Sequence, residues 1–261
     1  MNNHNNYIEK LFNLGNKVVL ITGATGQLGH EICMAYYNAG SKVIGADKVL
    51  SKKKIIADNC VYIAMDVCNK DSVLKSFEFI YDKYGRVDIL INNAGVSCFE
   101  PYEDRTEESF DWVMDVNLKG TFFCIQEYSR MVKERNHRGN IVNIASIYGL
   151  ISPDFRIYTD CNRKNSEVYG ATKAGIIQMT RYFAVHLADY GINVNCVSPG
   201  GIFNPEEPQG EDFVKNYSYR NPMGRMANAG ETIGAILYLS SEAASYTTGQ
   251  NIAVDGGMGS W

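Results

Sequence analysis

Seven short apolar runs, rich in β-branched residues, recur along the chain and leave room for helices between them. Each run is nearly continuously apolar, which is typical of strands buried on both faces of a parallel sheet. The runs are KVVLIT (17–22), KVIGA (42–46), CVYIAM (60–65), VDILIN (87–92), NIVNIA (140–145), INVNCV (192–197) and NIAVD (251–255). This pattern limits the chain to an α/β architecture with buried strands.

Helical periodicity fills most of the gaps between these runs. In 71–84 the apolar residues recur at steps of three and four, which places them in one stripe along a helix. The same spacing predicts helices over 27–39, 107–135, 168–190 and 229–240. Gly40, Gly85 and Gly191 each follow a helical segment and precede a strand, where glycine ends a helix in the left-handed conformation. Repeated helix–Gly–strand units predict one doubly wound α/β domain over 16–261, with about seven parallel strands flanked by helices.

Composition excludes several classes of protein and partner. The 25 Lys and Arg against 29 Asp and Glu give a net charge of −4, so we expect no nucleic-acid or membrane partner. No stretch approaches the roughly 18 apolar residues of a membrane span, and the Asn-rich residues 1–15 lack a secretory signal and predict a flexible tail. The seven cysteines form no C-x-x-C pair, which indicates free thiols and a cytoplasmic protein. The four histidines are scattered, so we expect no metal site.

A glycine-rich turn, GATGQLG (23–29), connects the first predicted strand directly to a helix. In this setting glycines let the backbone approach a pyrophosphate, and the N–H groups at the helix N-terminus bind it. The turn therefore predicts a dinucleotide site. Its candidate residues are Gly23, Thr25, Gly26, Gln27, Leu28 and Gly29.

Two acidic residues at strand ends extend this prediction to the rest of the nucleotide. Asp47 ends the second predicted strand, where a carboxylate binds an adenosine ribose and repels a 2′-phosphate. We therefore expect NAD, although Lys48 and Lys52–Lys54 leave NADP open. Asp66 follows the third predicted strand, where its carboxylate is placed to meet the adenine amine. Its alternative role is a helix N-cap, for which Asp71 fits better.

Short motifs also occur along the chain in a fixed order. They are TGATGQLG (22–29), MDV (65–67), NNAG (92–95), VNLKG (116–120), IAS (144–146), YGATK (169–173), SPGG (198–201) and VDGG (254–257). With these motifs the chain from about residue 16 onward resembles the short-chain dehydrogenase/reductase family. The resemblance implies a Rossmann fold, a nicotinamide cofactor, a Ser–Tyr–Lys active site and assembly as a homotetramer or homodimer.

Four residues match the catalytic positions of that family. Tyr169 and Lys173 lie four residues apart and share a helix face, so the lysine ammonium is expected to lower the pKa of Tyr169. The resemblance implies that Lys173 also binds the nicotinamide ribose, and that Ser146 holds the substrate oxygen. It implies that Asn117 keeps a water in line with the lysine. It adds cofactor contacts at Val67, Asn93, Ala94, Gly95, Tyr169, Lys173, Pro199, Gly200 and Ile202.

Two departures from the family pattern leave alternatives open. Gln27 stands at the middle glycine position of the turn, and Ser146 and Tyr169 lie further apart than is usual in short members. Both features suggest a sugar-nucleotide epimerase or dehydratase, which would keep its NAD tightly bound. A dinucleotide-sensing protein without turnover is a second alternative, but the intact Tyr–Lys pair counts against it. The short C-terminal part favours a short-type dehydrogenase or reductase.

The extra segment 147–168 leaves the sheet directly after Ser146, so it is expected to border the substrate pocket. Its composition is polar, like that of 201–221, and polar walls suit hydroxyl-rich or charged ligands. We therefore expect a small polar, carbohydrate-like substrate. Arg156 or Arg163 is expected to hold a phosphate or carboxylate on it.

Overall fold

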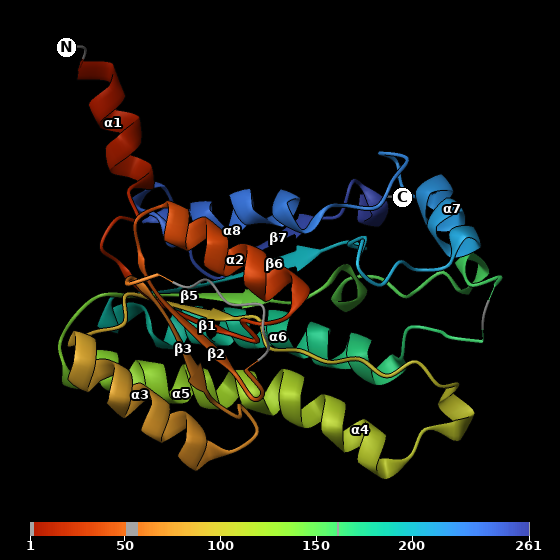
Figure 1. The fold of residues 1–261 in the computed structure, drawn as a ribbon, viewed down its shortest axis with the longest axis horizontal. Coiled ribbons are helices and arrows are strands. Elements are labelled where there is room, and N and C mark those ends of the chain that lie inside the picture. The colour runs from red at the N-terminus through yellow and green to blue at the C-terminus, as the bar shows by residue number, and fades with distance from the viewer. Residues whose placement is uncertain (1–2, 51–56, 161, 261) are drawn as a thin grey trace.

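The computed structural model describes residues 3–50, 57–160 and 162–260. Within them, seven strands form one parallel sheet in the order β3-β2-β1-β4-β5-β6-β7, which confirms the predicted fold class (Figure 1). The strands are β1 (Val18–Thr22), β2 (Lys42–Asp47), β3 (Cys60–Ala64), β4 (Ile89–Asn92), β5 (Gly139–Ile144), β6 (Ile192–Pro199) and β7 (Asn251–Val254). Helices cover both faces of the sheet, so the fold is of the doubly wound Rossmann type.

Two layers of helices enclose the sheet (Figure 1). One layer contains α2 (Gln27–Asn38) and α8 (Ile233–Ser240). The other contains α3 (Lys70–Tyr84), α4 (Glu107–Met114), α5 (Gly120–Glu134) and α6 (Glu167–His186). A further helix, α7 (Glu211–Arg220), lies beyond the end of β6 and was not expected from the sequence.

Alternate side chains of β1 enter different apolar clusters, which explains why this strand is apolar throughout. Val19 and Ile21 are buried in a cluster that includes Ile236 of α8. Leu20, between them, is buried in the opposite cluster, which includes Phe77 of α3. Both faces of the sheet are therefore packed, and the stripe predicted over 71–84 covers one of them.

Backbone geometry confirms the glycines that were predicted to end helices. Gly40, Gly85 and Gly191 have φ angles of 78°, 75° and 67°, in the left-handed region that favours glycine. Each lies between the end of a helix and the start of the next strand. The three βα units that the sequence predicted therefore have the expected junctions.

The N-terminus of α3 differs from the prediction. Asn69 is its N-cap, because the Asn69 side chain accepts a hydrogen bond from the Ser72 N–H at 3.0 Å. Asp71, which we expected to cap this helix, lies within its first turn. Asp66 does not cap it either, since its carboxylate accepts from the N–H of Cys68 at 3.0 Å.

The predicted helix over 107–135 is interrupted. A π-helical turn, Asp115–Lys119, lies between α4 and α5, and one buried side chain of this turn is that of Asn117. Such turns are rare and contain one residue more than the α-helical turn they replace. Hydrophobic periodicity predicts the helices on both sides but does not detect a single extra residue between them.

Residues that we expected to form a flexible tail contain a helix, α1 (Asn3–Phe12). It projects from the body of the domain, with Tyr7, Ile8 and Phe12 exposed (Figure 1). The segment is therefore ordered as a helix rather than as an irregular tail. Its flexibility stays a prediction.

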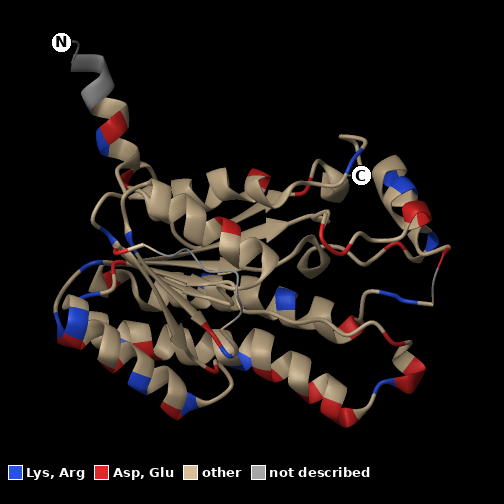
Figure 2. Cartoon of the chain, in the orientation of Figure 1, with Lys and Arg blue, Asp and Glu red and all other residues tan. Residues whose placement is uncertain are grey.

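Among the described residues, no helix has both the length and the apolar character needed to cross a membrane. In the same part of the chain, no three His, Cys, Asp or Glu side chains are grouped as they would be around a metal ion. The six described cysteines are free thiols, and Cys161 lies outside the described residues. Acidic and basic residues are interspersed over the helices (Figure 2).

Candidate active site

The glycine-rich turn borders a cavity of about 550 Å³ at the carboxyl ends of β1, β2 and β4, which we call the nucleotide cavity. It brings together twelve of the residues predicted to bind the cofactor. They are Gly23, Thr25, Gly26, Gln27, Leu28, Gly29, Asp47, Asp66, Val67, Asn93, Ala94 and Gly95. Strand ends at the point where the strand order reverses are where open α/β sheets bind nucleotides.

Close backbone packing explains why the turn needs glycine. A Cβ atom on Gly29 would lie 2.0 Å from the carbonyl oxygen of Gly23. Gly23 has a φ of +63°, and a Cβ there would lie 2.8 Å from the Cα of Ala94. Gly26, the N-cap of α2, has no side chain to bond the first N–H groups of this helix. These N–H groups are therefore suited to bind a pyrophosphate.

The amide of Asn93 fixes the turn to the end of β4. Its Nδ2 donates to the carbonyl oxygens of Thr22 and Gly23, both at 3.0 Å. In return, the backbone N–H groups of Asn93 and Ala94 donate to the Thr22 hydroxyl at 3.0 Å. The floor of the nucleotide cavity is thus held by hydrogen bonds within the protein itself.

Asp47 lies at the edge of the nucleotide cavity with its carboxylate anchored. Its Oδ2 accepts hydrogen bonds from the Thr25 N–H at 3.0 Å and from the Thr25 hydroxyl at 2.7 Å. The neighbouring Lys48 does not pair with it, because the Lys48 ammonium lies 2.9 Å from Asp66. Lys52–Lys54 lie outside the described residues.

A second cavity of about 350 Å³ adjoins the first, and we call it the catalytic cavity. The two cavities share Leu28, Asn93, Gly95 and Val96. The other predicted residues that line the catalytic cavity are Ser146, Tyr169, Lys173, Pro199, Gly200 and Ile202. The structure therefore places the predicted proton-transfer residues next to the predicted nucleotide site.

Tyr169 and Lys173 are positioned by the first turns of α6. The helix begins after Ser166, whose hydroxyl accepts the Tyr169 N–H at 3.2 Å. The Lys173 Nζ lies 5.5 Å from the centre of the Tyr169 ring and donates to the carbonyl oxygen of Ile144 at 2.9 Å. Burial lowers the pKa of Lys173 to about 8, since desolvation penalises the ammonium.

The expected lowering of the Tyr169 pKa is wrong for the protein without cofactor. Burial raises the pKa of Tyr169 above its ordinary value, and a hydrogen bond with the Ser146 side chain offsets this only in part. The prediction considered the charge of Lys173 but not the burial of both side chains. Without cofactor, this site therefore holds Tyr169 as a neutral phenol.

Asn117 lies beside the catalytic cavity but is not one of its lining residues. Its Oδ1 accepts the Val96 N–H at 2.8 Å, and its Nδ2 donates to the Val96 carbonyl oxygen at 2.9 Å. The same Nδ2 donates to the Thr172 hydroxyl at 3.1 Å. The side chain therefore joins the loop after β4 to α6, and its predicted role in holding a water stays a prediction.

The extra segment after Ser146 packs against α7. Ile157 and Tyr158 contact an apolar cluster with Phe213 and Tyr217 of that helix. This apolar packing was not expected, because the overall composition of the segment is polar. Of this segment, Asn165 lines the catalytic cavity.

The two arginines that we expected to bind an anionic substrate do not line the catalytic cavity. The Arg156 side chain is 87% exposed and pairs with Asp154 at 2.7 Å. The Arg163 guanidinium lies 4.7 Å from the centre of the Phe99 ring. The expected contact of these arginines with an anionic substrate therefore stays a prediction.

Two of the residues that line the catalytic cavity, Phe99 and Asn165, were missed by the sequence analysis. Neither belongs to a motif, and both lie in irregular segments without periodicity. The one available signal was the position of Asn165 within the extra segment, four residues before Tyr169.

Comparison with known proteins agrees with this geometry. A family model described as enoyl-(acyl carrier protein) reductase matches residues 23–259, which is most of the chain. The chain belongs to the short-chain dehydrogenase/reductase family. As a member of this family it is an oxidoreductase that acts on CH–OH groups with a nicotinamide cofactor.

Three members of the family illustrate the similarity. A 3-oxoacyl-[acyl-carrier-protein] reductase of Thermotoga maritima is 36% identical over 258 residues, which cover 94% of this chain and 98% of that protein. An NAD-dependent glycerol dehydrogenase of Listeria innocua is 33% identical over 259 residues, covering 95% and 96%. A crystal structure of a short-chain dehydrogenase from Leptospira borgpetersenii with bound NAD⁺ is 42% identical, has a TM-score of 0.89, and covers 94% of this chain and 93% of that one.

Proposed function

We propose that this protein is an NAD-preferring dehydrogenase or reductase of a small polar, carbohydrate-like substrate. The observation that carries the cofactor preference is the anchored carboxylate of Asp47 at the edge of the nucleotide cavity. A fixed negative charge there attracts ribose hydroxyls and repels the 2′-phosphate of NADP. The bound NAD⁺ of the Leptospira structure and the NAD dependence of the Listeria enzyme support the same preference.

The nicotinamide supplies the hydride acceptor or donor when it is bound, and the chain supplies the proton. Tyr169, which lines the catalytic cavity with Ser146, gives its phenol proton to the substrate carbonyl oxygen during reduction. During oxidation Tyr169 first loses that proton to solvent and then, as a phenolate, takes the proton of the substrate hydroxyl. Ser146 orients the substrate oxygen. Lys173, buried one helical turn from Tyr169, holds a positive charge near the reacting groups when it is protonated.

The catalytic cavity supports a small substrate with several hydroxyl groups. Its volume is about 350 Å³, and the hydroxyl or amide groups of Ser97, Ser146, Asn165 and Tyr169 line it. Buried polar groups need partners on the ligand. Glycerol, the substrate in the name of the Listeria relative, has this chemistry.

The two alternatives left open by the sequence have no support from the three relatives described above, none of which is named as an epimerase, a dehydratase or a sensor. The intact set of Ser146, Tyr169 and Lys173 also favours turnover over sensing. We further propose that the protein is cytoplasmic, as its cysteine pattern suggests. We also propose that it forms a homotetramer or homodimer, as the family resemblance implies.

The test is a substrate panel of polyols, sugars, sugar nucleotides and a 3-oxoacyl thioester, followed through the absorbance of the reduced nicotinamide. Each substrate is assayed with NAD(H) and with NADP(H). We expect the highest kcat/KM with NAD and a polyol or sugar. A higher value with the thioester would overturn the substrate class, and product formation without net change in the nicotinamide would favour an epimerase.

A further inference from the structure

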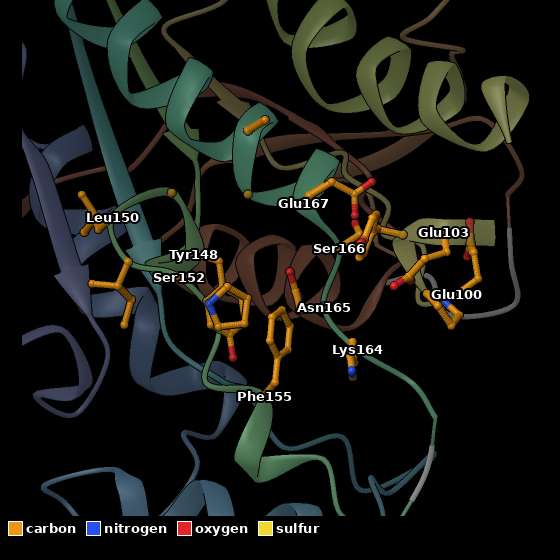
Figure 3. Close-up of a pocket in the computed structure, with 17 residues that line it drawn as sticks. Glu100, Glu103, Tyr148, Leu150, Ser152, Phe155, Lys164, Asn165, Ser166 and Glu167 are labelled. Atoms are coloured by element: carbon orange, nitrogen blue, oxygen red, sulfur yellow. The ribbon is translucent and has the colours of Figure 1, made fainter. Parts of the chain in front are cut away.

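Phe99 and Tyr169 both line the catalytic cavity but come from segments far apart in the sequence. Phe99 lies in the segment between β4 and α4, whereas Tyr169 lies in the first turn of α6. A glutamate is close to each of them in the chain, since Glu100 follows Phe99 and Glu167 precedes Tyr169 by two residues. Figure 3 shows both glutamates on the wall of a further cavity of about 740 Å³. The shape of the catalytic cavity therefore depends on what fixes one segment to the other.

The guanidinium of Arg105 joins the two glutamates. Its Nη1 donates to the Oε1 of Glu100, and its Nη2 donates to the Glu100 carbonyl oxygen at 3.2 Å. Its Nε donates to the Oε1 of Glu167 at 3.0 Å. A guanidinium presents its donors in a rigid fork, so one side chain can hold both segments at once. We call Arg105, Glu100 and Glu167 the arginine clamp.

The arginine clamp is more than an exposed ion pair. The Arg105 side chain is only 6% exposed, against 37% for Glu100 and 50% for Glu167. Hydrogen bonds lower the pKa of both carboxyl groups, mainly from the Ser109 hydroxyl to Glu100 and from Arg105 to Glu167, so both are ionised near pH 7. Exposed ion pairs contribute little, but a buried guanidinium needs its charged partners. The geometry of the clamp is therefore well defined.

The arginine clamp reaches the catalytic cavity through Phe99. The second carboxylate oxygen of Glu100, Oε2, accepts the Phe99 N–H at 3.1 Å. The Phe99 carbonyl oxygen accepts the N–H of Lys164, which lies just before α6, at 3.2 Å. Both backbone groups of Phe99 are thus bonded, one of them to a member of the clamp.

We propose that Arg105 is a positioning residue that sets the place of Phe99 relative to Tyr169, and with it the fit of the substrate in the catalytic cavity. Arg105 is not one of the residues that line this cavity, so it acts through Glu100 and Glu167. This inference rests on the proposed function and adds to it a residue outside the reacting groups. Small displacements of groups that hold a substrate can lower the rate strongly.

The test compares Arg105→Met, which removes the donors but keeps much of the side-chain length, with Arg105→Lys, which keeps the charge. Arg130→Met is the matched control, because Arg130 also pairs with two glutamates, Glu127 and Glu134, but within α5. Two quantities are measured for each variant. Amide hydrogen exchange at Lys164 reports whether the Phe99 segment is held, and kcat/KM for glycerol with NAD reports the fit of the substrate.

We expect Arg105→Met to speed exchange of the Lys164 amide by about threefold or more and to lower kcat/KM for glycerol by about tenfold or more. The Phe203 amide, which is bonded to Ala227 away from the clamp, should exchange as in the wild type, so the change is local. The dissociation constant for NAD should stay within about twofold, because other residues line the nucleotide cavity.

The remaining variants separate the donor from the charge. Arg105→Lys should lie between the wild type and Arg105→Met in both measurements, since an ammonium lacks the fork that holds two glutamates. Arg130→Met should match the wild type in both. If Arg105→Met does not fold, Glu167→Gln weakens the clamp at α6 and should shift both quantities in the same direction.

Unchanged exchange at Lys164 in Arg105→Met would overturn the proposal whatever the substrate is, because the segment would then be held without the clamp. Faster exchange with an unchanged kcat/KM would also overturn it, since the fit of the substrate would not depend on the clamp. A wild type that uses a 3-oxoacyl thioester but not glycerol would contradict the proposed substrate class instead. The same comparison made with the thioester would then decide the role of Arg105.

Discussion

Lys173 donates a hydrogen bond from its Nζ to the carbonyl oxygen of Ile144 at 2.9 Å, and only 3% of its surface is exposed. Its burial lowers its pKa from 10.5 to about 8. One hydrogen bond to a neutral oxygen does not replace the hydration of an ammonium. The cofactor-free fold is therefore less stable because it contains this residue, which binding and catalysis need.

This relationship predicts how stability depends on pH. Below pH 8, Lys173 is protonated in the folded and the unfolded chain, and the cost of burying its charge is present. Between pH 8 and 10.5 only the unfolded chain keeps the proton, so the contribution of Lys173 to the free energy of unfolding rises with pH. Lys173→Met should therefore stabilise the cofactor-free protein at pH 7 by about 1–3 kcal/mol and reduce this rise.

Urea unfolding at pH 7 and pH 10 measures both effects, with Lys75→Met as the control because Lys75 is exposed on α3. The control should change neither quantity by more than about 0.5 kcal/mol. If Lys173→Met were less stable than the wild type at pH 7, the ammonium would have a stronger partner than Ile144.

Removal of the Tyr169 hydroxyl should abolish turnover without removing the cofactor site. We expect Tyr169→Phe to lower kcat by at least about 100-fold, because the proton then has no acceptor or donor in the site. NAD affinity, measured by calorimetry, should stay within about threefold, since the ring and Lys173 remain. Turnover above about a tenth of the wild-type value would disprove the assignment.

The charge of Asp47 should set the choice between NAD and NADP. Asp47→Asn keeps a side-chain oxygen for Thr25 but removes the negative charge. We expect its ratio of kcat/KM for NAD to that for NADP to fall by about tenfold or more. Asp71→Asn, an exposed site on α3, is the matched control and should leave the ratio unchanged. A wild type that uses NADP as well as NAD would refute the proposed preference.

Two glycines of the turn should respond differently to alanine. In Gly29→Ala the new Cβ would meet the Gly23 carbonyl oxygen at 2.0 Å, so we expect a loss of about 3 kcal/mol in stability. In Gly26→Ala the nearest atom lies at 3.5 Å, an ordinary contact, so the fold should be nearly unaffected. Thermal unfolding measures the stability of both variants. An equal loss of stability in both would show that the close packing at Gly29 is not what makes alanine destabilising there.

Gly26→Ala also tests the nucleotide cavity directly. The added methyl group occupies the side of the turn that lines the cavity, so NAD binding should weaken although stability does not change. Unchanged NAD affinity would place the pyrophosphate elsewhere.

The strands and the paired residues of the active site could be predicted because their signals are local. Buried parallel strands need continuous apolar runs, and Tyr169 and Lys173 share a face through helical spacing alone. The glycines of the turn were found in the same way, since close backbone approach excludes any other residue at Gly29.

The features that the sequence did not predict depend on contacts between distant segments. The cluster of Ile157 and Phe213 joins two segments that are irregular or short, and no period connects them. The pKa of Tyr169 is raised because the side chain is buried, and the four-residue spacing between Tyr169 and Lys173 does not indicate how deeply the side chains are buried. The position of Asn165 depends on the path of the chain between Lys164 and Ser166.

The π-helical turn at Asp115–Lys119 has a consequence for how such a site can arise. A π turn holds one residue more than an α turn, so the helices on either side keep the faces that they present to the sheet. Inserting one codon can therefore change which side chain of an existing helix faces the loop after β4, while the core packing stays the same. Deleting one codon there would close the helix again, leave α4 and α5 packed, and withdraw Asn117 from Val96.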